Sequence, residues 1–271
     1  MKIFLLIVLF NLFFLPPPFM AKSQNLRRGD ESFRQLRSSH FIVNYQEGVD
    51  RAYAREIKKK SEYFYKRVTQ EFHLVRDELW LWDNRAKVFI AKDKEEYLKN
   101  FYCPDWSAAC VDYMTKTIYT YPSQKDFITI LVHELTHIIF REYLGRGNLP
   151  LWLDEGIALY TEAKFGGANY HDFLYRIRER VKNDNFIPFK EIINLKMFDL
   201  KDRTAAEVNI FYLQSFSMIN FIVERYRKHR FSQFLWNLKN ESNVEKALAK
   251  TYYHLNNLAN FEEKWKEFYL K

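Results

Sequence analysis

Two adjoining stretches of this chain decide its fold: residues 127–144 read FITILVHELTHIIFREYL, and residues 149–160 read LPLWLDEGIALY. The first stretch is strongly apolar, has the length of a helix, and is followed by Gly145 and Gly147, which end helices well. The second begins after Pro150 and is followed by Gly166 and Gly167. We therefore predict two consecutive helices, over residues 127–144 and 151–163.

The first of these helices carries His133-Glu134-Leu135-Thr136-His137. Residues four positions apart lie one above the other on a helix face, so both imidazoles can reach one metal ion. Glu134 projects near the same face, where its carboxylate can contact a water molecule held by the ion. The opposite side would anchor the helix in the core through apolar residues: Leu131, Leu135, Ile138 and Ile139.

A metal site of this kind needs a third ligand, and Glu155 is the first candidate, with seventeen residues between it and His137. Gly156 follows it, and we expect this glycine to permit close approach of its backbone to the motif helix. Asp154 and Glu162 are rival ligands. Glu162 is two turns further along the helix, and Asp154 faces another direction, from which it can hydrogen-bond to a ligating histidine.

The rest of the chain changes character at residue 127. Before it, strands and helices are mixed; after it, the pattern is helical almost throughout. We predict an α+β fold in which an N-terminal mixed α/β lobe with a small sheet precedes a mostly helical C-terminal lobe, with the zinc site in the cleft between them. The predicted strands are residues 41–45 and 86–91 and a hairpin over 110–121, and the predicted helices are residues 50–72, 94–101, 171–182, 209–227, 243–253 and 261–269.

The hairpin over residues 110–121 alternates apolar and polar residues, with its turn expected near residues 114–116. Its outer strand is either an ordinary part of the sheet or an edge to which an extended peptide can add. Cys103 and Cys110 lie seven positions apart, just before and at the start of this hairpin. They can form a short-loop disulfide in an exported protein, or remain two buried thiols.

Residues 1–23 have the pattern of a signal peptide: Lys2, an apolar run to residue 15, three prolines, and small residues at Ala21 and Ser23. We expect cleavage after Ser23 and export to the periplasm or the medium. The alternative is an uncleaved N-terminal anchor. Removal of Lys2 and Lys22 leaves 40 basic and 34 acidic residues, a net charge of +6. Acids are interleaved with these bases, so we expect no nucleic-acid partner, and membrane contact only through the N-terminal segment.

The two motifs together resemble those of the gluzincin peptidases, and most closely the compact thermolysin-related peptidase MA-like domains. The shared residues are H-E-L-T-H at 133–137 and L-P-x-W-L-x-E-G-x-A-x-Y at 149–160. Looser likeness lies in the strands at 40–45 and 87–90, in FYLQSFSMI at 211–219 and in FEEKWKEF at 261–268. The resemblance implies a catalytic domain over residues 40–271, preceded by a lead-in over residues 24–39.

The resemblance also implies a mechanism. One Zn²⁺ per chain would be bound by His133, His137 and Glu155, and Glu134 would be the general base in the hydrolysis of a peptide or protein substrate. Related enzymes often use a tyrosine of a later helix to stabilise the oxyanion, and Tyr212 occupies a similar place; His171 is a second candidate. No Gly-x-Met-Glu-Asn stretch precedes His133, which favours an endopeptidase over an aminopeptidase.

Two other interpretations remain open at this level. The chain could be an exported metal-binding or peptide-binding module on the same fold, with little turnover. It could also be a structural α+β domain in which the His-Glu-x-x-His pattern is a coincidence, although the second motif at Glu155 argues against that. The sequence does not indicate an oligomeric state.

Overall fold

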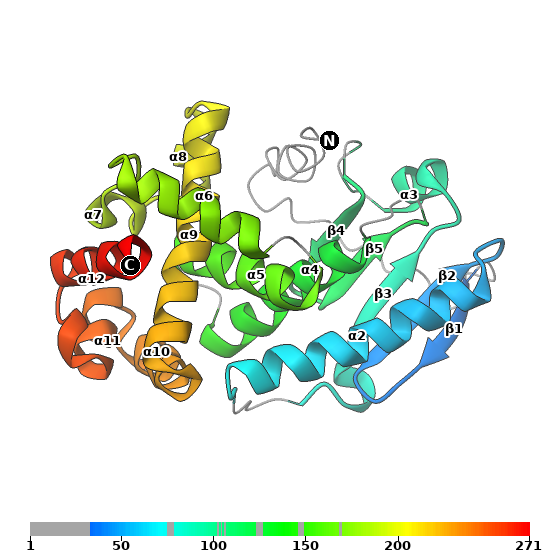
Figure 1. The fold of residues 1–271 in the computed structure, drawn as a ribbon. Coiled ribbons are helices and arrows are strands. Elements are labelled where there is room, and N and C mark those ends of the chain that lie inside the picture. The colour runs from blue at the N-terminus through cyan, green and yellow to red at the C-terminus, as the bar shows by residue number, and fades with distance from the viewer. Residues whose placement is uncertain are drawn as a thin grey trace. The chain divides into compact units, whose positions relative to one another are not determined.

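A computed structural model describes residues 33–74, 79–101, 103, 105, 107–122, 127–145, 149–167 and 170–271 (Figure 1). The predicted signal peptide, residues 1–23, lies outside the described residues. The chain divides into two compact units, Met1–Tyr65 with Glu78–Glu134 and Lys66–Asp77 with Leu135–Lys271. The first holds the sheet and the second is helical, so the fold class is α+β, as the sequence predicts.

The first unit is built on one five-stranded sheet with the order β1-β2-β3-β5-β4. Strands β2, β3 and β5 are parallel, while β1 and β4 pair antiparallel at the two edges. Strand β4 is therefore an edge strand, and β4 with β5 is the predicted hairpin. The strands are β1 (Phe33–Arg37), β2 (Phe41–Gln46), β3 (Ala86–Ile90), β4 (Ala109–Asp112) and β5 (Thr117–Thr120).

Both faces of this sheet are covered, because apolar side chains point to each side. Phe41 of β2 meets Tyr65 of helix α2 (Arg51–Glu71), with ring centroids 6.1 Å apart. Phe89 of β3 meets Phe101, which follows helix α3 (Lys94–Asn100), at 6.0 Å. Phe41 pairs in register with Ala86, and Phe89 lies three residues beyond Ala86. Since side chains alternate along a strand, the two aromatic contacts lie on opposite faces.

A disulfide joins Cys103 to Cys110 and so fixes the segment after α3 to the start of the edge strand β4, with the two Cα atoms 5.8 Å apart. This resolves the choice left open by the sequence. Asp93 caps α3, because its carboxylate accepts a hydrogen bond from the amide of Glu96 at 2.9 Å. The short helix between β3 and the disulfide is thus fixed at both ends.

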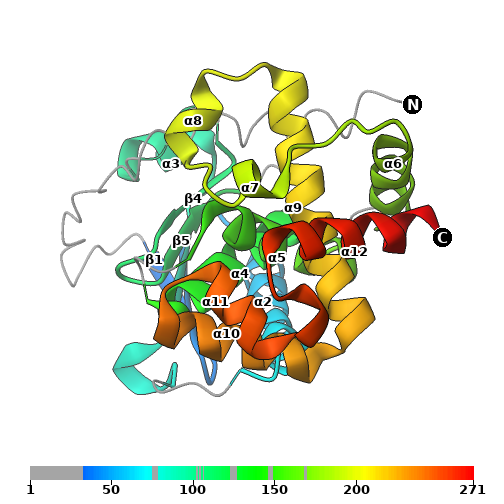
Figure 2. The ribbon, with the colours of Figure 1, turned by 90° about the vertical axis from the view of Figure 1, so that its left-hand side faces the viewer.

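The second unit contains the C-terminal part of α4 and the helices that follow it (Figure 2). The helices are α4 (Phe127–Leu144), α5 (Leu151–Phe165), α6 (Tyr170–Lys182), α7 (Phe189–Ile192), α8 (Met197–Lys201), α9 (Ala205–Tyr226), α10 (Lys228–Glu241), α11 (Val244–Thr251) and α12 (Leu258–Leu270). Two 3₁₀ turns complete the described elements: Trp82–Asn84 in the first unit and Tyr253–Leu255 in the second.

Helices α5 and α9 pack closely against each other at Gly156. A Cβ atom at Gly156 would lie 2.5 Å from the backbone oxygen of Ser215 and 2.8 Å from the side chain of Ile219. The prediction that Gly156 approaches the motif helix is therefore wrong. One residue is about 100° of helix rotation, so a glycine next to a residue that faces α4 points to another neighbour, which is α9.

Helix α12 closes the second unit against α9 through polar contacts inside an apolar interface. The Trp265 indole donates to Ser217 Oγ at 3.0 Å, and the Tyr269 hydroxyl donates to the Ser217 carbonyl at 3.0 Å. Both aromatic side chains are buried. The contacts satisfy polar groups that would otherwise be costly to bury, so the C-terminal helix is an integral part of the helical core.

The structure contains elements that the sequence analysis did not predict. Strand β1 lies within residues 24–39, where the sequence analysis placed no strand, and α10 lies between two predicted helices. A break in the helix separates α9 from α10: Arg227 has a φ of +68°, so α9 ends at Tyr226 and α10 begins at Lys228.

Among the described helices, none is long and apolar enough to cross a membrane.

Candidate metal centre

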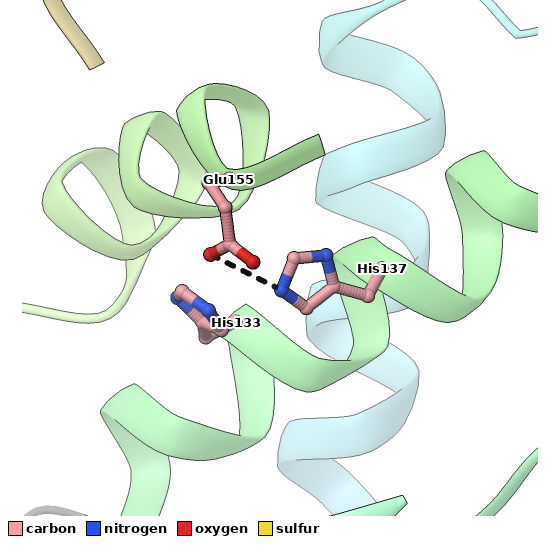
Figure 3. A group of neighbouring side chains, drawn as sticks. All are labelled: His133, His137 and Glu155. Atoms are coloured by element: carbon pink, nitrogen blue, oxygen red, sulfur yellow. Dashed lines mark ion pairs between the residues drawn. The ribbon is translucent and has the colours of Figure 1, made fainter. Parts of the chain in front are cut away.

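Helix α4 positions the two histidines of the motif, and α5 brings a carboxylate to them (Figure 3). His133, His137 and Glu155 are each only 3% exposed. Each offers one ligand atom, and the three atoms all lie within 4.8 Å of one another. The structure thus brings together the three residues that the sequence analysis predicted as metal ligands, and neither of the rival acids, Asp154 and Glu162, belongs to this group.

The spacing of these atoms suits a shared ion better than a direct hydrogen bond. His137 Nε2 lies 3.8 Å from Glu155 Oε2, beyond the roughly 2.7–3.2 Å of an N–H···O hydrogen bond. Two ligands that are each about 2.0–2.2 Å from a tetrahedral zinc ion lie about 3.3–3.6 Å apart. Two imidazole nitrogens and one carboxylate are also the donor types that zinc accepts, so these residues fit the ion.

Asp154 lies beside the cluster and holds one of its histidines. Its Oδ1 atom lies 2.6 Å from His137 Nδ1. Asp154 as a whole residue is 5% exposed. Burial acts to raise the pKa of Asp154, but the neighbouring His137 and Arg141 outweigh it and hold the pKa below its usual value. Asp154 therefore orients a histidine, which is the contact expected from its direction on the helix.

Arg141 is a residue of this centre that the sequence analysis missed. It lies one turn after His137 on α4 and donates two hydrogen bonds to Asp154 Oδ2, from Nε at 2.8 Å and from a terminal nitrogen at 2.6 Å. The signal that could have found it is the four-residue step His133, His137, Arg141, which places all three on one helix face. The spacing along α4 does not predict that Arg141 binds Asp154, because Asp154 lies on another helix.

Glu134 is less buried than the two histidines that flank it in the motif. Within the first unit, the charge of Glu134 acts on Tyr97, a buried residue of α3. The Tyr97 hydroxyl lies 2.9 Å from Ser107 Oγ. Burial raises the pKa of Tyr97, and the nearby charges of Tyr121 and Glu134 add to the rise. The Glu134 side chain is therefore partly exposed, and it lies near enough to Tyr97 for its charge to affect the ionisation of that hydroxyl.

The two residues considered as oxyanion donors lie in different surroundings. Tyr212 is buried on α9, and burial together with the charges of Glu155 and Asp154 raises its pKa well above the ordinary value. Tyr212 therefore lies close to the metal-ligand cluster and keeps its proton at neutral pH. His171 is exposed in the first turn of α6, where its ring contacts Tyr170 at 5.9 Å. It is outside the cluster of possible ligands.

Comparison with known proteins agrees with this geometry. The sequence model of the Peptidase MA superfamily matches residues 87–271, which include both metal-binding motifs. No curated protein is similar enough to match.

Among solved structures, native yeast LTA4 hydrolase is similar, with a TM-score of 0.53 and 14% sequence identity over 86% of this chain and 38% of that chain. The complex of yeast LTA4 hydrolase with bestatin has a TM-score of 0.47 and 14% identity, over 88% of this chain and 36% of that one. The present chain thus spans less than two fifths of those proteins, and the likeness to the native structure is one of fold. The Peptidase MA sequence model, by contrast, covers more than half of the chain and confirms the resemblance noted in the motifs. This chain therefore belongs to the Peptidase MA superfamily, with a gluzincin-like domain.

Proposed function

We propose that this chain is a zinc-dependent peptidase in which His133, His137 and Glu155 bind one zinc ion and Glu134 is the general base. The observation that carries the proposal is the buried cluster of three ligand atoms within 4.8 Å, formed by two consecutive helices. A zinc ion bound there would polarise the carbonyl of a peptide bond and make water more acidic. The two imidazoles and the carboxylate would hold the ion and leave it accessible to substrate or water.

The protein side chains divide the remaining work. Glu134 directly follows a ligand and is only half-buried, so its carboxylate can accept a proton from the attacking water and return it to the leaving amine. Tyr212 keeps its hydroxyl proton beside Glu155, so it can donate a hydrogen bond to the oxyanion as the carbonyl carbon becomes tetrahedral. His171 is exposed, which makes it the weaker candidate for this role.

The substrate side of the proposal is an endopeptidase that acts on peptides or proteins. It rests on the lack of a Gly-x-Met-Glu-Asn stretch before His133. A peptide with an acetylated N-terminus should therefore be cleaved as well as its free counterpart. Cleavage that requires a free amine would contradict this part of the proposal.

We also propose that the protein is exported, on the pattern of residues 1–23 and on the disulfide between Cys103 and Cys110, a bond typical of oxidising compartments. N-terminal sequencing of the exported protein should begin at Gln24. A chain that retains Met1 would instead indicate the N-terminal anchor.

The direct test of catalysis compares the wild type with Glu134→Gln for zinc content and for cleavage of a casein-type substrate. Both proteins should contain about one zinc per chain, and the variant should lose at least about 10²-fold in kcat, as expected for removal of a general base. Glu142→Gln, on the same helix but outside the cluster, is the control and should keep its activity. Zinc without cleavage in wild type and variant alike would instead indicate a metal-binding module.

A further inference from the structure

The contacts of Asp154 tie the two ligand-bearing helices together. Both of its carboxylate oxygens are engaged by side chains of α4: Oδ1 by His137 Nδ1 at 2.6 Å, and Oδ2 by Arg141 at 2.6 and 2.8 Å. Asp154 directly precedes Glu155 in the first turn of α5. Asp154 thus links the proposed ligand His137, and Arg141 of the same helix, to the backbone of α5 that carries the other proposed ligand, Glu155.

These contacts also determine which nitrogen of His137 faces the cluster. An ionised carboxylate only accepts hydrogen bonds, so the Nδ1 atom of His137 must carry the proton in this pair. In a neutral imidazole with its proton on Nδ1, the lone pair that can bind a metal is on Nε2, and Nε2 is the atom that lies 3.8 Å from Glu155 Oε2. A metal ligand needs that tautomer, and a hydrogen bond at the other nitrogen is the usual way to fix it.

Arg141 completes the arrangement by fixing the carboxylate itself. The Asp154 side chain is 6% exposed and that of Arg141 is 29% exposed, so a partly exposed guanidinium binds a buried carboxylate. Two N–H groups on one oxygen leave the other oxygen aimed at His137. Without them, the carboxylate would keep one strong partner and could rotate away from the imidazole or take up a proton.

We propose that Arg141 is a positioning residue that acts through Asp154: it holds the carboxylate in the orientation that fixes His137 as the Nδ1–H tautomer and sets the spacing of α4 and α5 for the metal. The part that concerns zinc rests on the proposed function. The part that concerns the tautomer holds for the metal-free protein as well, so the two can fail separately.

The first experiment measures zinc affinity by competition with a chelator for the wild type, Arg141→Gln, Arg141→Lys and Asp154→Asn. We expect Asp154→Asn to weaken zinc binding about 10–100-fold, because the amide has one acceptor oxygen for the two donor side chains, His137 and Arg141. We expect Arg141→Gln to weaken it about 10-fold. Arg141→Lys keeps the charge and loses the fork, so it should fall between Arg141→Gln and the wild type. The double variant Arg141→Gln/Asp154→Asn should be no weaker than Asp154→Asn, since both changes remove one linked interaction.

The matched control is Arg203→Gln. The Arg203 side chain is 23% exposed, close to that of Arg141, and also pairs with a carboxylate, that of Glu191. It lies outside the metal-ligand cluster, so its loss should leave zinc affinity unchanged. Thermal unfolding of the metal-free variants separates a loss of zinc affinity from a failure to fold.

The second experiment observes the His137 imidazole in the metal-free protein by ¹⁵N NMR, with the resonance assigned from its loss in His137→Gln. The wild type should show a protected Nδ1 proton, and Arg141→Gln should lose that protection, whereas Arg203→Gln should keep it. A wild type that shows this proton yet binds no zinc would remove the proposed function and leave the positioning role standing.

Two results would overturn the inference. One is an Arg141→Gln variant with unchanged or tighter zinc binding and an unchanged Nδ1 proton, even if its thermal stability falls, because Arg141 would then be structural only. The other is a double variant whose loss of zinc affinity equals the product of the two single losses, because Arg141 would then not act through Asp154.

Discussion

The surroundings of Tyr212 bear directly on the role proposed for its hydroxyl. It is 3% exposed, and the charges of Glu155 and Asp154 are close enough to raise its pKa. A hydroxyl that stays protonated beside a metal ligand can donate a hydrogen bond to developing negative charge.

If Tyr212 is the oxyanion donor, Tyr212→Phe should lower kcat by about 10²-fold or more and leave zinc content near that of the wild type. Steady-state kinetics and metal analysis measure the two quantities. Tyr175→Phe, at a side chain that is 65% exposed, is the control. A Tyr212→Phe enzyme with nearly wild-type kcat would exclude the role.

The residues of the site differ in how far the sequence could predict them. Helical spacing alone predicts that His133 and His137 lie together, and a second motif adds Glu155, so the three residues of the cluster could be predicted before the structure. The contact of Gly156 with Ser215 and that of Arg141 with Asp154 were not. Both depend on the direction in which two helices face each other, and that direction is set by tertiary packing rather than by local pattern.

At the scale of elements, two ion pairs on one buried carboxylate join the end of α2 to α5 and α10 within the second unit. The Glu71 carboxylate, whose side chain is 5% exposed, lies 3.0 Å from Lys164 of α5 and 2.7 Å from Lys228 of α10. The Tyr160 hydroxyl also donates to it at 3.2 Å. Burial acts to raise the pKa of Glu71, but the hydrogen bonds from Lys228 and Lys164 outweigh it, so the pKa is lowered from 4.5.

Because the folded pKa of Glu71 is depressed, its stabilising contribution is complete above the unfolded value and is lost as the pH falls through the folded pKa. Glu71→Gln should therefore lower the free energy of unfolding by about 1–3 kcal/mol near pH 6, and the gap to the wild type should narrow towards pH 3. Urea unfolding at the two pH values tests this. Glu179→Gln, which breaks an exposed pair with Lys182, should change stability by less than about 0.5 kcal/mol. A gap for Glu71→Gln that is equal at both pH values would contradict the assignment.

Most of the elements that the sequence analysis missed lack the clear apolar periodicity of the predicted ones. Long helices such as α2, α4 and α5, and strands in which apolar and polar residues alternate, can be recognised from their sequence pattern. Strand β1 is largely exposed and pairs only with β2, so its sequence carries little apolar pattern. Helices α7 and α8 have four and five residues, too few for a helical period. Helix α10 does carry the pattern, with Phe231, Phe234, Leu235 and Leu238 buried.

At the scale of the whole molecule, the family match and the fold do not coincide at the N-terminal side. The match begins at residue 87, inside β3. Strands β1 and β2 lie before it, yet β2 pairs with β3 along its length. The described residues before the match therefore complete the sheet of the first unit, and the matched segment alone would leave β3 unpaired on one side.

The measurement that tests the account most directly is zinc binding by the wild type and by Glu155→Gln, with Glu162→Gln as a control on the same helix. Glu162 is also a buried glutamate but is outside the ligand cluster. The account predicts about one zinc per chain for the wild type and the control, and an affinity at least about 10²-fold weaker when the carboxylate ligand is lost. Equal zinc binding by Glu155→Gln and the wild type, or no zinc in the wild type, would contradict the assignment of this metal centre.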